Sequence, residues 1–235
     1  MDMANTMALL WGTKPAPTRG RKPGMTIDRI VATAVAVADA DGLDALSMRR
    51  VADELGVGTM SLYRYLPGKA ELFELMLDAV MGEDPMVPTG DGWRDSLAEV
   101  ARRSLAGYRR HPWLLEASLS HGLVGPNQAA VLDRLLAALD GTGLTSGRKM
   151  AVIGLLIGYV QGRARRLADA ARTERGVSDG WFWAEFAPLL EPHLDRFPSL
   201  AAAWRDDELT WEDEFEFGLR RVLDGIEAHI DRGDQ

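Results

Sequence analysis

The sequence predicts an all-α protein with a small N-terminal helix-turn-helix domain and a larger C-terminal helical domain. From Thr26 onward, apolar residues recur at the i, i+3, i+4 and i+7 spacing of amphipathic helices. No stretch shows the strict alternation of a half-buried strand between turn signals. A segment rich in glycine and proline, residues 82–92, separates the two parts and predicts a domain boundary.

Composition indicates a soluble globular protein, with 46% hydrophobic and 26% charged residues among 235. The chain has no cysteine, which excludes disulfides, thiolate metal sites and a cysteine nucleophile. The longest apolar run, residues 150–160, is well short of the roughly 20 residues that a membrane span needs. No signal-peptide pattern appears at the N-terminus, so we expect a cytoplasmic protein without a membrane partner.

The net charge of −8 argues weakly against binding to nucleic acid, but its distribution is uneven. Residues 1–81 hold 9 basic and 10 acidic side chains, whereas residues 82–235 hold 18 and 25. The basic residues of the first part cluster locally. Any anion-binding surface should therefore lie in the N-terminal third.

The N-terminal elements follow from capping and turn residues. Residues 1–25 contain "TKPAPTRGRKPG" and predict a flexible basic tail, because proline, glycine and isolated charges cannot bury a core. Thr26 and Ser47 are expected N-caps, and Gly42 and Gly56 are expected to end the helices that follow those caps. We expect helices at about 27–41, 47–55 and 59–66, and a fourth from Lys69, within a domain at 26–81.

After the boundary, every periodic segment of the second domain, residues 93–235, is helical. We expect helices at about 93–110, 113–120, 126–140, 146–172, 179–194, 198–206 and 211–231.

The segment "LGVGTMSLYRYLPGKAEL", residues 55–72, indicates chemistry beyond packing. On a helical wheel Leu62 and Leu66 fall together, while Met60 and Arg64 fall on the opposite side with Ser61 between. Two short helices joined by "GVG" fit a helix-turn-helix. An outward arginine suits guanine in a DNA major groove, and hydroxyl side chains suit bases or phosphates.

This region resembles the DNA-binding domain of the TetR family of bacterial repressors. The residues that carry the resemblance are "SMRRVADELGVGTMSLYRYLPGKAELFELML", with its Ala-x-x-x-Gly-Val turn, its Leu-Tyr-x-Tyr helix and its Lys-x-x-Leu start of the next helix. Further along, "YRRHPWLLEA", "GPN" and "AVIGLLIGYVQG" are similar to the ligand-binding and dimerisation domain of the tetracycline-repressor branch.

The resemblance implies DNA contacts for eight residues. Thr59, Met60, Ser61 and Arg64 would face bases, and Tyr63, Tyr65, Lys69 and Arg49 would hold phosphates. The arginine at position 64 departs from the side chains that some relatives carry there and favours a guanine contact. Basic residues of the tail could also reach the minor groove, although a solvated tail explains them better.

Candidates for a ligand pocket are large apolar or aromatic residues of the second domain. Aromatics can line a site for a large flat ligand, and they can also simply fill a core. The candidates are Trp113, Leu114, Leu155, Gly158, Tyr159, Gln161, Trp181, Trp183 and Phe186.

A dimer interface is expected on two helices. Glycines at four-residue spacing in residues 146–172 allow close packing or leave room for a ligand, and the apolar stripe of the last helix suits either a core or a dimer seam. The resemblance implies that these helices form a four-helix bundle between two chains. The residues are Gly154, Gly162, Phe215, Leu219, Val222 and Ile226.

Taken together, these features predict a homodimeric repressor that binds a pseudopalindromic operator in double-stranded DNA and is released by a small-molecule inducer. No motif of nucleophilic, metal-dependent or nucleotide-dependent catalysis is present, and the scattered histidines do not require a metal, so we expect no enzyme, cofactor or metal. The alternative is a helical protein that binds or sequesters a small molecule without binding DNA.

Overall fold

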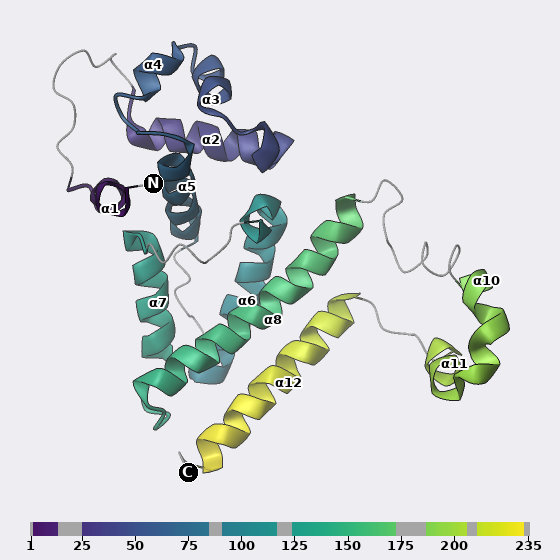
Figure 1. Cartoon of the computed structure of the whole chain (residues 1–235). Coiled ribbons are helices and arrows are strands. Elements are labelled where there is room, and N and C mark those ends of the chain that lie inside the picture. The colour runs from purple at the N-terminus through teal and green to yellow at the C-terminus, as the bar shows by residue number, and fades with distance from the viewer. Residues whose placement is uncertain are drawn as a thin grey trace.

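The structure is a computed structural model that describes residues 2–13, 25–84, 91–116, 124–172, 187–205 and 211–232. Within these ranges every regular element is a helix, which confirms the predicted class (Figure 1). The N-terminal part comprises α1 (Met3–Leu10), α2 (Ile27–Asp41), η1 (Leu43–Ala45), α3 (Met48–Glu54), α4 (Thr59–Leu62) and α5 (Lys69–Glu83).

The C-terminal part is built from longer helices around α8. Its elements are α6 (Trp93–Arg110), η2 (Pro112–Leu115), α7 (Pro126–Ala138), α8 (Ser146–Arg172), α10 (Ala187–Leu190), η5 (Glu191–Arg196), α11 (Pro198–Arg205) and α12 (Trp211–Arg232). In the described part of the expected helix at 113–120 the chain forms a 3-10 turn at 112–115, and residues 117–120 lie outside the described residues. Of the expected helix at 179–194, only residues 187–194 lie among the described residues.

The predicted caps of the N-terminal helices are present. The hydroxyl oxygens of Thr26 and Ser47 accept hydrogen bonds from the amides of Arg29 and Arg50, each at 3.1 Å. Gly56 adopts a φ of 64°, a left-handed conformation that a side chain would strain. The two caps explain why α2 and α3 begin where the sequence predicts, and the conformation of Gly56 explains why α3 ends before it.

Two hydrophobic cores divide the structure. The first lies among α1 to α5 and includes Val51, Leu62, Leu66 and Met76, all inaccessible to solvent. It also includes Trp113 of η2. The small N-terminal unit is therefore packed directly onto the end of α6, rather than joined to it through the 82–92 segment alone.

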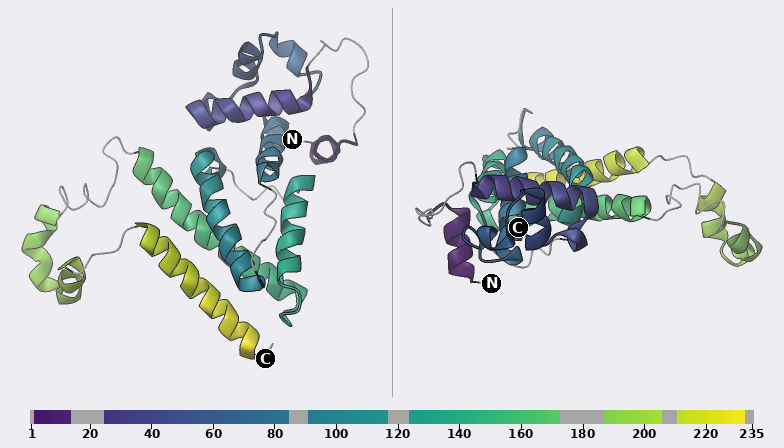
Figure 2. Two further views of the ribbon diagram at one scale, coloured as in Figure 1. Left: turned by 180° about the vertical axis from the view of Figure 1, so that it is seen from behind. Right: turned by 90° about the horizontal axis from the view of Figure 1, so that it is seen from above.

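The second core lies among α6, α7, α8 and α12. Ion pairs along its surface tie α12 to α6: Arg102 donates to both carboxylate oxygens of Glu216 at 2.7 and 2.8 Å, and Arg94 contacts Asp224 and Glu227. The hydrogen bonds from Arg102 hold the pKa of Glu216 below its usual value. Figure 2 shows α10 and α11 standing away from this bundle.

The prediction of a flexible tail at 1–25 is wrong for residues 2–13. They form α1, whose start is capped by Asp2, and Leu9 and Leu10 are buried in the first core. The helix forms because the apolar residues of "MANTMALL" can cover the side of α5, a long-range contact that local composition does not reveal. Residues 14–24, which carry all of the tail's basic side chains, lie outside the described residues.

A buried carboxylate joins α5 to the start of α7. Asp78 of α5 accepts hydrogen bonds from the backbone amides of Asn127 and Gln128 at 3.1 and 3.0 Å, while the Asn127 side chain donates to the Asp78 carbonyl at 3.1 Å. Asp78 thus satisfies amides that have no partner within α7. Gly125 is required beside it, because a Cβ atom there would overlap the Asp78 carboxylate.

In the described part of the chain, no helix combines the length and the apolar character that a bilayer crossing requires.

The Asp78 cap predicts a steep cost for Gly125→Ala. The added methyl group must displace the carboxylate, so the free energy of unfolding should fall by about 1–3 kcal/mol, measured by urea denaturation. Gly147→Ala is the control, because open space surrounds that position, and it should stay within about 0.5 kcal/mol of the parent protein. Equal unfolding midpoints for the two variants would contradict this packing.

Candidate nucleic-acid interface and ligand cavity

Two short helices, α3 and α4, form a helix-turn-helix at the far end of the N-terminal unit (Figure 1). The turn between them is fixed by hydrogen bonds from the Gly56 amide to the Asp53 carbonyl at 3.1 Å and from the Val57 amide to the Ala52 carbonyl at 3.0 Å. The end of α2 supports the same unit, since Arg50 pairs with Asp41 at 3.2 Å.

The second helix of the motif is shorter than the predicted 59–66. The α-helix ends at Leu62, and the chain continues through a turn in which the Tyr65 and Leu66 amides both donate to the Leu62 carbonyl, at 2.8 and 3.0 Å. The following Pro67 has no amide hydrogen and disfavours helix at the residue before it. The short helix and this turn together cover the 59–66 range that the sequence predicted as one helix.

The predicted division of this surface into two faces is confirmed. Leu62 and Leu66 are completely buried, whereas 74% of Met60 and 46% of Tyr63 are exposed. Arg64 is exposed as well, and the partly exposed residues are Thr59, Ser61 and Tyr65. Two apolar anchors therefore hold a short polar segment at the surface.

The two flanking basic residues differ in their contacts. Arg49 is exposed and approaches Asp53 at 3.9 Å, a weak surface pair. The Lys69 ammonium donates to the Leu43 carbonyl at 3.3 Å, which holds it beside η1. Both charges lie on the exposed surface around α4, and their contacts with phosphate remain a prediction.

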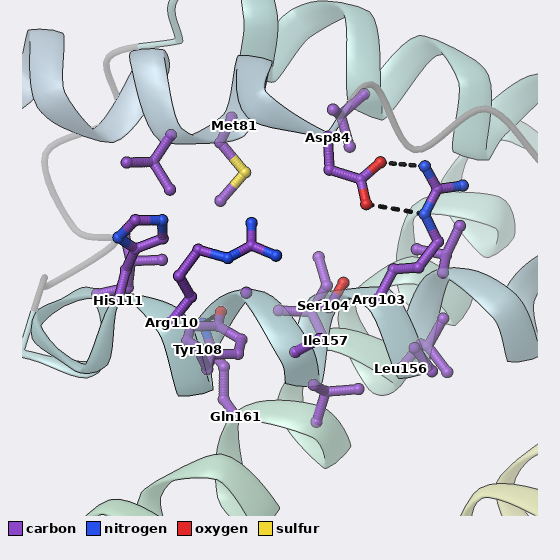
Figure 3. Close-up of a pocket in the computed structure, with 18 of the residues that line it drawn as sticks. Met81, Asp84, Arg103, Ser104, Tyr108, Arg110, His111, Leu156, Ile157 and Gln161 are labelled. Atoms are coloured by element: carbon purple, nitrogen blue, oxygen red, sulfur yellow. Dashed lines mark hydrogen bonds and ion pairs between the residues drawn. The ribbon is translucent and has the colours of Figure 1, made fainter. Parts of the chain in front are cut away.

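A cavity of about 400 Å³ lies between α5, α6, α7 and α8. This volume falls in the range that holds drug-sized ligands. Its walls are mainly apolar, as Figure 3 shows for Met81, Leu156 and Ile157. The other apolar lining residues are Val80, Val100, Ala101, Ala106, Leu114, Val131, Leu135, Ile153 and Val160.

Polar groups in the cavity come chiefly from α6 and α8. Gln161 donates from its amide to the Tyr108 hydroxyl at 2.9 Å. Burial raises the pKa of Tyr108, and the hydrogen bond from Gln161 opposes that rise. The hydroxyl stays protonated at neutral pH and can donate to a ligand oxygen.

The charged residues that line the cavity are paired. Arg103 donates to both oxygens of Asp84 across the gap between α6 and α5 (Figure 3). Arg110 lies 3.6 Å from Glu83. With two arginines and two carboxylates, these lining groups contribute no net charge.

The ligand candidates from the sequence are largely misplaced. Leu114 and Gln161 line the cavity, but Leu155 and Gly158 are exposed on the other side of α8. Tyr159 instead stacks on Phe215 with 5.7 Å between ring centroids and donates to its backbone carbonyl at 2.7 Å, joining α8 to α12. Trp181, Trp183 and Phe186 lie outside the described residues.

The prediction that Trp113 lines the ligand pocket is wrong, because this side chain is buried between the two parts of the chain. Only 2% of it is exposed, and its indole donates to the Asp39 carboxylate of α2 at 2.7 Å. His111 contacts the same Asp39 oxygen at 2.7 Å through one ring nitrogen and Glu83 at 3.0 Å through the other. His111 also lines the cavity, so one side chain touches both the cavity and the N-terminal unit.

Three polar lining residues, Ser104, Tyr108 and His111, were not among the residues predicted for the site. The sequence does contain a pattern that could have identified them. Positions 100, 104, 107, 108 and 111 lie on one face of a helix. Their mixed polarity concealed it, because a face with serine, glycine, tyrosine and histidine does not match an apolar stripe.

The predicted dimer residues fall into two groups. Phe215, Leu219 and Ile226 are at most 4% exposed and belong to the chain's own second core, so Phe215 and Leu219 are not available to a partner, whereas Ile226 also borders a shallow groove at the surface between α8 and α12. The glycines Gly154 and Gly162 are exposed on α8, with open space where a Cβ would lie.

Val222 is half-buried and lines a shallow groove with Leu155 between α8 and α12. Leu155 is 53% exposed on the α8 side of this groove.

No group of three or more histidine or acidic side chains in the described ranges is arranged to hold a metal.

Comparisons with known proteins identify the family of this chain. The family described as "Bacterial regulatory proteins, tetR family" matches residues 30–76, and "Tetracyclin repressor-like, C-terminal domain" matches residues 85–230. The HTH-type transcriptional repressor DrrR1 of Streptomyces coeruleorubidus is 46% identical over 97% of this chain and 87% of that protein. An HTH-type transcriptional regulator of Saccharopolyspora erythraea is 30% identical over 92% of this chain and 90% of that protein.

Among solved structures, the complex of the Streptomyces coelicolor TetR family protein ActR with actinorhodin superposes with a TM-score of 0.74. It is 29% identical and covers 88% of this chain and 97% of the other. The helix-turn-helix, the helical C-terminal part and these matches agree: the chain belongs to the TetR family of bacterial regulatory proteins, with a tetracycline repressor-like C-terminal domain.

Proposed function

We propose that the protein is a homodimeric transcriptional repressor that reads operator DNA with α4 and is released when a small molecule fills the cavity. The observation that carries the proposal is the two-faced α4 segment, in which fully buried leucines support an exposed Met60, Tyr63 and Arg64. Membership of a family of regulators favours this role over an enzymatic one. A repressor of this kind works beside DNA in the bacterial cytoplasm.

Base contacts are assigned to Thr59, Met60, Ser61 and Arg64. The exposed arginine can donate two hydrogen bonds to O6 and N7 of guanine, and the methionine can contact a thymine methyl group. Tyr63, Tyr65, Arg49 and Lys69 lie around this segment and can hold phosphates, which fixes orientation without reading sequence. In a dimer, two such heads would require half-sites about 34–36 Å apart or a multiple of that spacing.

The inducer is a flat, largely apolar molecule with a few hydrogen-bonding oxygens. Apolar walls favour such a molecule, and the Tyr108–Gln161 pair offers both a donor and an acceptor. The balance of charges among the lining groups selects neither a strong anion nor a strong cation. Actinorhodin, which occupies the related ActR, is a suitable first probe.

His111 connects the cavity to the DNA-reading part. It touches the space that a ligand fills and also contacts Asp39 at the end of α2. Since α2 packs against α3 and shares a core with Leu62 and Leu66, a displaced α6 end would tilt α4. The ligand would thereby change the separation of the two reading heads in a dimer, as expected for two linked sites.

The dimer surface assigned here is the exposed side of α8 and α12. These helices lie side by side, and their outer face carries Gly154, Leu155, Gly158 and Gly162 on α8 and Val222 and Gly225 on α12. Small residues let a second pair of helices approach closely, and a two-fold axis would place this face against itself. In this arrangement Phe215 and Leu219 stay in the chain's own core, and Ile226 borders the interface.

The DNA-binding proposal predicts that the protein retards a fragment of its own promoter, with affinity that falls steeply as salt rises. Arg64→Ala should reduce discrimination at one base pair by about 1–3 kcal/mol, measured by fluorescence anisotropy on single-substitution fragments. Arg196→Ala is the matched control, because it removes an exposed arginine far from α4. If both variants discriminate like the parent, the contact assignment is wrong. If the parent binds no fragment at low salt, the protein is a ligand-binding protein rather than a repressor.

The dimer assignment predicts that Leu155→Asp produces monomers. The side chain is 53% exposed, so the substitution should spare the fold while placing two like charges near a two-fold axis. Sedimentation should report about half of the parent mass. Met60→Asp, at 74% exposure in the reading segment, should leave the mass unchanged. A dimeric Leu155→Asp protein would place the interface elsewhere.

A further inference from the structure

Helix α1 precedes the two ranges that the family descriptions match. Those matches begin at residue 30, whereas α1 covers Met3–Leu10. Despite this position it is an ordered part of the fold, lying beside α5 and near the start of α7 (Figure 1). The contacts of α1 therefore indicate its role in the fold.

One side of α1 is attached to the N-terminal unit. Leu9 and Leu10 are 7% and 8% exposed and belong to the core that also contains Leu72 and Met76 of α5. Thr6 is completely buried, and its hydroxyl donates to the Asp2 carbonyl at 2.9 Å. This packing makes α1 move together with α5.

The end of α1 is attached to the other part of the chain. The Trp11 indole donates to the Val124 carbonyl at 3.1 Å, across 113 positions of sequence. Val124 lies two residues before α7, at the same place where Asp78 of α5 caps the α7 amides. Trp11 and Asp78 therefore hold the start of α7 from two different helices.

We propose that α1 is a strap that fixes the angle between α5 and α7, with Trp11 as its positioning residue. A change of that angle would carry α5 and the attached helix-turn-helix away from α7, so the Trp11 hydrogen bond must break. The strap thus biases the chain toward the orientation seen here. Its consequence for gene regulation rests on the proposed repressor function, but the strap itself does not.

The size of the bias follows from the contact. One hydrogen bond at the surface, once lost, should change the ratio of two orientations by about two- to fivefold. Removal of the whole helix should change it further, because the Leu9 and Leu10 contacts are lost as well. Both effects are large enough for a distance measurement to resolve.

The test uses pairs of spin labels in the full-length protein. The chain has no cysteine, so Asp53→Cys on α3 and Asp133→Cys on α7 provide two unique attachment points. Excess unlabelled chains keep only one labelled chain in any dimer. Trp11→Phe should broaden or shift the distance distribution by adding a second orientation, and deletion of residues 2–13 should do so more strongly.

Two comparisons keep the strap proposal open to refutation. Met3→Ala alters an exposed residue of the same helix and should leave the distances unchanged. If α1 merely stabilises the first core, the deletion will lower the melting temperature while Trp11→Phe keeps the parent distribution, and that result overturns the proposal. These distances need no DNA, so failure of the parent protein to bind its promoter would count against the repressor function alone.

Discussion

The contact of Asp39 with Trp113 and His111 is the interaction on which the two-part architecture depends. One carboxylate oxygen on α2 lies 2.7 Å from the Trp113 indole nitrogen and 2.7 Å from a ring nitrogen of His111. Both partners are nearly inaccessible to solvent. Loss of the carboxylate would leave two buried donors unsatisfied, a greater cost than the loss of the hydrogen bonds themselves. The end of α6 and the end of α2 must therefore move together.

The Asp39 contact matters for function because it joins the helix that supports α4 to the helix that lines the cavity. On one side, α2 shares a closely packed core with Leu62 and Leu66, which fix the exposed α4 residues. On the other side, α6 supplies Ser104, Tyr108 and His111 to a mostly apolar cavity. A packed interior transmits displacement instead of absorbing it. A molecule that changes the cavity wall can therefore change the direction of the DNA-reading surface, while Asp78 and Trp11 restrain the same movement at α7.

The sequence predicted best those features that depend on neighbouring residues. Thr26 and Ser47 were identifiable as caps, and the opposite faces of Leu62 and Met60 followed from helical spacing alone. Periodicity could not tell which partner an apolar stripe meets. Leu219 therefore suited a dimer seam as well as the core it actually fills, and Trp113 suited a pocket as well as the joint with α2. Helix α1 was missed for a related reason, because its stability comes from distant α5 residues.

The most direct test of the account is the effect of actinorhodin on promoter affinity in the parent protein and in Asp39→Ala. The account predicts that actinorhodin releases the parent from DNA. It also predicts that Asp39→Ala binds actinorhodin equally well by tryptophan fluorescence, while the change in its DNA affinity is about tenfold smaller. Asp41→Ala, which loses only a surface pair with Arg50, should respond like the parent. An Asp39→Ala protein released as fully as the parent would contradict the proposed route, and a parent that ignores actinorhodin would contradict the proposed class of inducer.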